Sequence, residues 1–265
     1  MIRRIKTNSL PGKSIFLLCV FFFPAVLAYS QGEIDTQDKI FFRNERTYAF
    51  NLNSNGWGFD FRYGQRVNAY RHRLYEVQFA EMKHPKEFKS SNPYIYTQDR
   101  YVFGKLNSFF NIRTGYGLQR QIYEKYDKGG ISIRRYFTTG ISLGILKPVY
   151  YEVLYPRDSI KVEKFDPAKH QLGDILGRAS FFKGFNEIHI TPGINAKYGY
   201  TFEFSKRDEV FRALELGAML DFFLLKPEIL SLAKNNNYFL TLFLSYRFGR
   251  IVDSRFKKVP DVAPY

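Results

Sequence analysis

The chain has 265 residues, a formal net charge of +15 and an aromatic content of 18%. This length is ample for one domain, and the basic balance favours an anionic partner such as lipid or nucleic acid. The single cysteine, Cys19, excludes a disulfide within the chain. Beyond residue 30 no segment reaches eighteen uninterrupted apolar residues, which excludes a transmembrane helix there.

The N-terminus has the features of a secretory signal peptide. Its first thirteen residues carry four basic side chains and no acidic one, and residues 15–27 form an apolar run interrupted only by Pro24. This run is too short to span a membrane as a helix, and small residues at 28 and 30 suit a cleavage site. Residues 1–30 are therefore predicted to direct export, which argues against nucleic acid as the partner. Residues 31–46 are predicted to form a short periplasmic lead-in.

Eight later segments alternate apolar and polar residues, as β-strands do when their two faces meet different surroundings. The last of them, residues 238–249, shows Tyr, Leu, Leu, Leu, Tyr and Phe on one face and Phe, Thr, Phe, Ser, Arg and Gly on the other. The other seven cover about 47–52, 57–64, 75–80, 110–119, 131–145, 194–204 and 213–222.

The connections between these segments alternate in length. Longer connections follow the third, fifth and seventh segments, and short turns follow the second, fourth and sixth. This pattern is typical of an eight-stranded, antiparallel, up-and-down transmembrane β-barrel with short periplasmic turns and longer outer loops. In the longest loop, apolar residues at helical spacing predict a short helix, which would be a lid, an interfacial helix or a helix packed on its own loop. These residues are Leu172, Ile175, Leu176, Ala179, Phe182 and Phe185.

Segments 107–117, 127–130 and 142–152 resemble small outer-membrane β-barrel proteins of Gram-negative bacteria, in particular uncharacterised Bacteroidota barrels. The resemblance covers about residues 45–250, so the barrel is placed at 47–250 and a tail at 251–265. It implies the fold and an outer-membrane location, but no reaction. In such proteins the final strand is recognised by the barrel-insertion machinery, and Tyr246 and Phe248 would supply that signal here.

If the apolar faces contact lipid, the opposite faces line the barrel lumen with equal numbers of acids and bases. An eight-stranded barrel is only wide enough to be filled by its own side chains, so these charges must pair. We therefore predict a closed polar lumen, with an ion pathway as the alternative. A soluble lipocalin-like barrel would instead place the apolar faces inside. The predicted luminal charges are Asp60, Arg62, Glu76, Arg113, Arg134, Lys197, Glu203, Glu215, Asp221 and Arg247.

The sequence contains no motif for nucleophilic, metal or phosphate chemistry. The histidines at 72, 84, 170 and 189 fall in or near turns and loops, and we predict that they are solvated. No catalytic residue, cofactor or metal is expected. A basic and aromatic loop could bind lipopolysaccharide phosphates or a partner protein, although a solvated basic loop has the same composition. Its candidate residues are Lys86, Lys89, Tyr94, Tyr96, Arg100 and Tyr101.

These features together predict an outer-membrane β-barrel with a structural or binding role in the cell envelope. Its extracellular loops would act on membrane lipid, lipopolysaccharide or an envelope protein. The alternatives are a lipid- or lipopolysaccharide-modifying barrel enzyme and a narrow pore.

Overall fold

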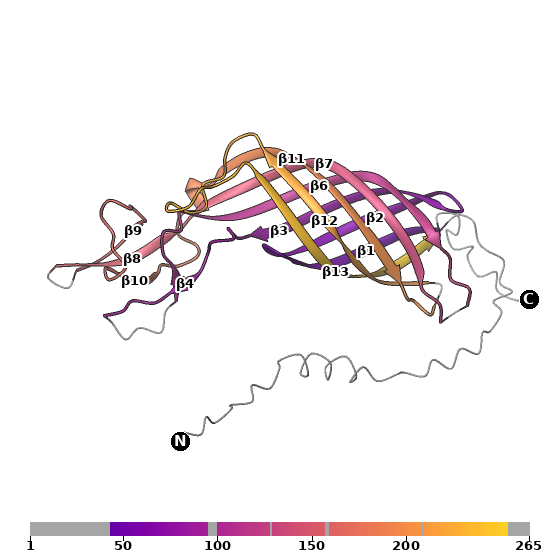
Figure 1. Cartoon of the computed structure of the whole chain (residues 1–265), viewed down its shortest axis with the longest axis horizontal. Helices are drawn as coiled ribbons and strands as arrows, with labels where there is room; N and C mark the ends of the chain where they lie inside the picture. Colours follow the sequence, from indigo (N-terminus) through magenta and orange to yellow (C-terminus); the bar gives the residue numbers. More distant parts are fainter. Residues whose placement is uncertain (1–42, 95–99, 128, 157–158, 208, 254–265) are drawn as a thin grey trace, which may run out of the picture. The chain divides into compact units, whose positions relative to one another are not determined.

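Eight antiparallel strands close into a barrel (Figure 1). The computed structural model describes residues 43–94, 100–127, 129–156, 159–207 and 209–253, so the predicted signal peptide and most of the predicted lead-in and tail lie outside it. The barrel strands are β1 (Arg43–Asn53), β2 (Gly56–Asn68), β3 (Arg71–Met82), β6 (Asn107–Tyr123), β7 (Ser132–Pro148), β11 (His189–Glu203), β12 (Val210–Phe223) and β13 (Tyr238–Asp253). The predicted eight-stranded fold is confirmed, with a first strand that starts four residues before position 47.

The barrel is closed by its first and last strands. β1 pairs with β13 from Arg43 opposite Asp253 to Asn53 opposite Phe243. Every other barrel strand pairs with the strands before and after it among the eight, which is the up-and-down order. Closure leaves no free edge in the wall, so every strand has hydrogen-bonding neighbours on both sides.

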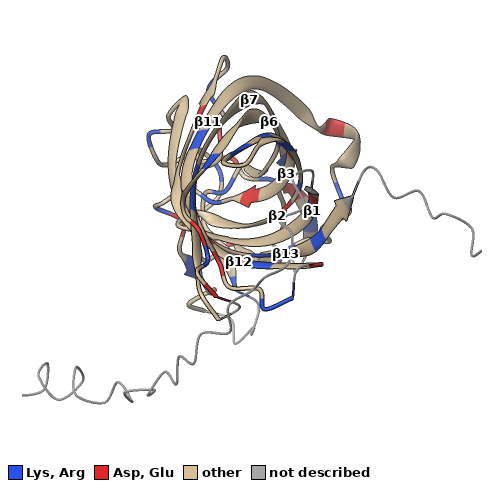
Figure 2. Ribbon diagram, turned by 90° about the vertical axis from the view of Figure 1, so that its right-hand side faces the viewer, with Lys and Arg blue, Asp and Glu red and all other residues tan. Residues whose placement is uncertain are grey.

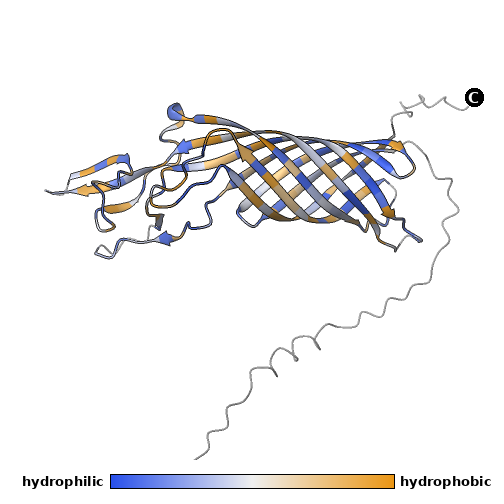
Figure 3. Cartoon of the chain, turned by 45° about the horizontal axis from the view of Figure 1, so that its top comes forward, coloured by the Kyte–Doolittle hydropathy of each residue, from blue (hydrophilic) through white to orange (hydrophobic). Residues whose placement is uncertain are grey.

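The outer wall is apolar and the interior is polar. Along β13, Leu240, Leu242 and Leu244 point outward and are exposed, whereas Thr241, Ser245 and Arg247 are buried inside. Figure 3 shows the same alternation of apolar and polar residues along the barrel strands. A soluble lipocalin-like barrel would need the reverse arrangement, so that alternative is wrong. The exposed apolar wall is the surface of a barrel that sits in lipid.

The two ends of the barrel differ in the length of their connections. One end holds the beginning of β1, the end of β13 and the short turns near residues 69–70, 124–131 and 204–209; we call it the turn end. The other end, the loop end, carries connections 83–106, 149–188 and 224–237. The first two connections form an extension of short strands beyond the wall (Figure 1). The extension contains β4 (Lys89–Ser90) paired with β5 (Tyr101–Val102), and a sheet in the order β10 (Ile175–Arg178), β8 (Tyr150–Tyr155), β9 (Ser159–Lys164).

The helix predicted between Leu172 and Phe185 is wrong. Residues 175–178 form β10 instead, with Ile175 opposite Val153 of β8, and only the 3-10 turn η1 (Phe185–Glu187) is helical in this stretch. Two glycines explain the failure: Gly177 weakens a helix, and Gly184 has a φ of 87°, which a right-handed helix does not contain. In the described part of the chain, no helix is long and apolar enough to cross a membrane.

Candidate functional site

All ten predicted luminal charges are buried inside the barrel. Figure 2 shows Lys, Arg, Asp and Glu along the barrel ribbons from the turn end. The ion pairs divide these residues into a central network, a pair nearer the loop end and a cluster at the turn end. The central network contains Asp60, Arg62, Glu76, Lys197, Glu215 and Arg247.

Glu215 is the centre of the central network. Its Oε1 lies 2.7 Å from Nη1 of Arg62 and 2.9 Å from Nε of Arg247, and Tyr136 donates its hydroxyl to Oε2 at 3.2 Å. Arg62 comes from β2 and Glu215 from β12, so their contact crosses the lumen. Lys197 binds Glu76 at 2.6 Å, which adds β11 and β3 to the same network.

The acids and bases of the central network balance, three against three. Arg62 also contacts Glu76, and Arg247 contacts Asp60 at 2.6 Å. A buried charge without a partner costs several kcal/mol, so this balance is the condition under which charges can fill the lumen.

A separate ion pair lies nearer the loop end. Asp221 accepts two hydrogen bonds from Arg113, each 2.8 Å long, in a bidentate arrangement. Asn111 and Ser142 also donate to Asp221 Oδ1, both at 3.0 Å. This carboxylate is therefore held by three side chains from β6 and β7, and it links them to β12.

The cluster at the turn end includes two residues that the sequence interpretation missed. Arg134 binds Glu45 at 2.6 Å and also Glu203, and Lys125 binds Glu203 at 2.7 Å. The sequence analysis places Glu45 in the predicted periplasmic lead-in, although it shares the strand face of Thr47 and continues the luminal alternation. Lys125 belongs to a turn, where no alternation indicates the direction of a side chain.

An apolar layer closes the lumen at the loop end. The rings of Phe109 and Phe223 lie 5.2 Å apart, and those of Phe109 and Phe239 5.6 Å apart. Ile229 and Leu230 of the connection 224–237 pack onto the same layer. Each of these phenylalanines sits beside an outward-facing aromatic residue, so the adjacent pairs at 109–110, 222–223 and 238–239 mark where both faces of the wall become apolar. The predicted closed lumen therefore holds charges in the middle and aromatic rings at one end.

The extension has an apolar core of its own. Tyr151, Val153 and Ile175 are fully buried in it, with Tyr101, Val149 and Phe165. Tyr151 donates its hydroxyl to the carbonyl of Val102 at 2.7 Å, and burial raises the pKa of this hydroxyl above its usual value. The prediction of Tyr101 as a surface-binding residue is wrong, because only 2% of it is exposed and its hydroxyl donates to Leu172 O at 2.8 Å.

The other predicted surface-binding residues remain on the outside. Lys86, Lys89, Tyr94 and Arg100 are exposed, and Tyr96 lies outside the described residues. They do not gather at one place, because Lys86 alone lines a groove at the loop end of the wall. This groove has a volume of about 880 Å³ and lies between connection 83–87, the β1–β2 turn and residues 234–240.

Three lysines give the groove its charge: Lys83, Lys86 and Lys234. Among the described residues, none of these lysines pairs with an acid. Glu87 is the acid in the lining, and Lys105 already neutralises it at 2.7 Å. Tyr238 adds an exposed aromatic ring on the lipid-facing side of β13. The groove therefore has the chemistry of a site for an anionic group at the membrane surface.

The prediction of solvated histidines is wrong for three of the four, because His72, His84 and His170 are buried and only His189 is exposed. His84 Nδ1 accepts the backbone N–H of Lys86 at 3.2 Å, which shapes the groove. His170 Nδ1 accepts the backbone N–H of Asp166, and its Nε2 lies 3.2 Å from Glu163. Both ring nitrogens of His170 thus stabilise the loop. Over the described ranges, no group of His, Cys, Asp and Glu could hold a metal ion.

Tyr246 and Phe248 lie side by side on the outer face of β13, with ring centroids 6.1 Å apart. Their exposure leaves both rings accessible on the final strand. Recognition of these rings by the insertion machinery stays a prediction.

No family model matches the chain, and no curated protein matches it. Among solved structures, Neisserial surface protein A is 9% identical at a TM-score of 0.39, covering 80% of this chain and 97% of its own. Ail, the attachment invasion locus protein of Yersinia pestis, in complex with the heparin analogue sucrose octasulfate, is 11% identical at a TM-score of 0.37, covering 80% and 99%. The N-terminal β-barrel domain of Pseudomonas aeruginosa OprF is 8% identical at a TM-score of 0.35, covering 79% and 97%. Similarity at this level does not extend to function.

Proposed function

We propose that this chain is a non-conducting outer-membrane protein that binds a phosphorylated surface glycolipid, of the lipopolysaccharide class, in the groove at its loop end. The observation that supports this proposal most strongly is the set of lysines at 83, 86 and 234, which lack acidic partners among the described residues. They lie at the rim of an apolar wall, where the headgroup phosphates of the outer leaflet would meet them.

Charge and position support a lipid in preference to a soluble anion. Leu240, which also lines the groove, is 66% exposed on the outer wall and would contact acyl chains. Tyr238 lies two residues before it on the same strand face, at the depth where aromatic rings meet headgroups. One ligand with phosphates and acyl chains can satisfy the lysines and this wall together.

The outer-membrane location completes the proposal. Export by residues 1–30 and insertion through Tyr246 and Phe248 would bring the barrel there with its turn end in the periplasm. The Gram-negative, Bacteroidota-type origin rests on the resemblance of the strand segments. Membrane fractionation with heat-modifiable gel mobility tests location and barrel closure together.

The filled lumen supports a binding role over a pore. The charge network and the aromatic layer occupy the space that ions would need. Conductance of the purified protein in a planar bilayer tests this point, and steady single-channel currents would contradict it. A lipid-modifying enzyme predicts an altered lipid A profile on deletion of the protein, whereas a binding protein predicts an unchanged one.

The binding experiment compares two variants with equal loss of charge. Lys83→Gln/Lys86→Gln/Lys234→Gln removes the groove lysines, and Lys161→Gln/Lys164→Gln/Lys169→Gln removes three exposed lysines of the extension. We expect the groove variant to bind purified lipopolysaccharide roughly tenfold more weakly and the extension variant to bind it like the wild type. Equal binding by all three proteins, or equal binding to dephosphorylated lipopolysaccharide, would overturn the proposal.

A further inference from the structure

The outer wall carries a ring of arginines at the turn end, opposite the extension. All of them are exposed, and all lie on the strand faces that point away from the lumen. We call this set the arginine girdle. Its members are Arg46 of β1, Arg71 and Arg73 of β3, Arg120 of β6, Arg135 of β7, Arg212 of β12 and Arg250 of β13.

Four of the seven girdle arginines stand at the same spacing from an aromatic residue of the wall. Arg46, Arg73 and Arg135 each stand two residues from an outward-facing ring on the same strand face. These rings are Tyr48, Tyr75 and Phe137, and Phe248 stands in the same relation to Arg250. Two strand residues span about 6.6 Å, so the guanidinium groups lie one step beyond the aromatic band, toward water. That step leads from the glycerol region of a bilayer to its phosphates.

Several girdle arginines stand directly opposite one another across neighbouring strands. Arg46 pairs with Arg250, and Arg120 pairs with both Arg71 and Arg135. Side chains opposite each other in this way are about 5 Å apart at Cβ, and like charges there destabilise the sheet. Within the described ranges, no girdle arginine forms an ion pair with an acid. Anions from outside the protein would therefore stabilise this part of the wall.

We infer that the arginine girdle binds the phosphates of anionic phospholipids in the periplasmic leaflet. The orientation of the barrel, with its turn end in the periplasm, is taken from the proposed function. A guanidinium offers a planar fork of donors that matches a phosphate, and one phosphate between two arginines removes their repulsion. Headgroup phosphates surround a membrane barrel on all sides, and the girdle has members on six of the eight barrel strands. A partner protein would instead contact only one side of the girdle, which favours lipid as the occupant.

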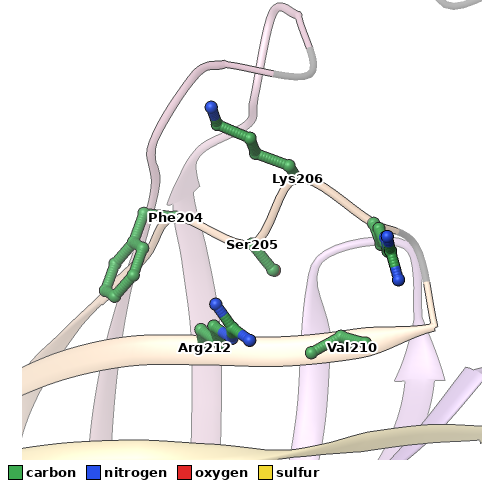
Figure 4. Close-up of a pocket in the computed structure, with 6 residues that line it drawn as sticks. Phe204, Ser205, Lys206, Val210 and Arg212 are labelled. Carbon is green, nitrogen blue, oxygen red and sulfur yellow. The ribbon is translucent and has the colours of Figure 1, made fainter.

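One part of the girdle forms a pocket. The turn between β11 and β12 and the start of β12 enclose about 400 Å³ between Phe204, Lys206 and Arg212 (Figure 4). Arg207 adds a third base to the lining, and Val210 adds an apolar side. Ser205, which also lines the pocket, donates its hydroxyl to the luminal Glu203 and so ties this turn to the charged interior. A phosphodiester can lie among the bases while its acyl chains follow Phe204 and the wall.

The test replaces the central row of the girdle in the full chain. Arg71→Gln/Arg120→Gln/Arg135→Gln removes three facing positive charges, and Lys161→Gln/Lys164→Gln/Lys169→Gln removes three from the extension, outside both the girdle and the groove, as a matched control. Native mass spectrometry then counts bound phosphatidylglycerol and bound phosphatidylcholine after delipidation and mixing with each lipid. We expect the wild type and the control to bind more phosphatidylglycerol than phosphatidylcholine. In the girdle variant the ratio of the two bound lipids should fall roughly tenfold.

Other outcomes decide against the inference. Equal retention of phosphatidylglycerol by the girdle variant would overturn it, as would displacement of the lipid by inorganic phosphate at the same concentration. Heat-modifiable mobility checks that each variant is folded, and Arg212→Gln in the pocket replaces the triple variant if the latter does not fold. The lipopolysaccharide experiment concerns the groove at the opposite end. A failure of the proposed function therefore appears as unchanged lipopolysaccharide binding by the groove variant, whereas a failure of this inference appears as unchanged phosphatidylglycerol binding by the girdle variant.

Discussion

The barrel and the extension arrange the same kinds of side chain in opposite ways. In the barrel, Glu215 and Arg247 are buried and Leu242 is exposed, whereas in the extension Val153 is buried and Lys161 is exposed. Lipid surrounds the first region and water the second, so each exposes what its surroundings accept. Alternation along a strand therefore indicates that its two faces meet different environments. Which kind of side chain is buried depends on how the sheet closes and on whether lipid or water surrounds it.

The largest expected effect comes from breaking the charge balance of the barrel. Glu215→Gln leaves Arg62 and Arg247 buried with one carboxylate fewer, which costs about 3–5 kcal/mol of unfolding free energy. Urea unfolding of the protein in detergent micelles measures this loss. The control is Glu209→Gln in an exposed turn, which should change the unfolding free energy by less than about 0.5 kcal/mol. Similar losses for the two variants would show that the luminal network does not hold the barrel together.

The matching change in the extension removes an apolar side chain. Ile175→Ala empties a fully buried position in the extension core and should cost the extension about 2–5 kcal/mol. Because this core is separate from the lumen, the urea midpoint of the barrel should stay the same while limited proteolysis of residues 150–178 becomes faster. Ile160→Ala, at an exposed position of β9, should alter neither. A shift of the barrel midpoint with Ile175→Ala would show that the two regions unfold together.

The sequence predicts the barrel better than the extension for a physical reason. Barrel strands are long enough for alternation to repeat several times, which is why Asp60, Arg113 and Asp221 could be placed inside. Extension strands have two to six residues, and β8 pairs with β10 across an intervening strand and turns, so local spacing does not reveal the partner.

The groove and most of the girdle are also not predicted by local alternation. Lysines 83, 86 and 234 reach one groove only after the barrel closes β1 against β13 and brings connections that are far apart in sequence together. The girdle was accessible from the sequence in part, because Arg135 interrupts an apolar strand face. Its cross-strand neighbours, Arg71 and Arg120, depend on the register of three strands, which alternation does not determine.

A smaller effect is expected where the loop connection packs on the barrel. Lys147 donates to Lys183 O at 2.9 Å and lies 4.7 Å from the ring centre of Phe181, so it fastens residues 181–187 to β7. Lys147→Gln should weaken this attachment by about 1–2 kcal/mol, seen as faster hydrogen exchange of the 181–187 amides. Lys226→Gln, at an exposed position of another loop, is the control. Unchanged exchange would show that the connection is held by its aromatic rings alone.

The smallest effect is a loosening of the extension in acid. The hydroxyl of Tyr155 donates to Glu163 and, together with His170, lowers the pKa of that carboxyl, and the Ala168 N–H lowers the pKa of Asp166. A pKa that is lower in the folded state adds stability above the unfolded value of about 4.3 for Glu. That stability is lost as the pH falls through the folded value.

Pepsin cleavage of the extension measures this loss between about pH 5 and about pH 2, a range that brackets the ordinary carboxyl pKa of roughly 4. The rate, relative to an unstructured reference peptide, should rise as the pH falls. Tyr155→Phe removes the hydroxyl that donates to Glu163, so the pKa of this carboxyl in the folded state moves closer to its unfolded value. Protonation then removes less stability, and the rise in cleavage rate should be shallower. A relative rate that does not change with pH, or a rise equally steep in Tyr155→Phe, would show that these carboxylates do not stabilise the extension.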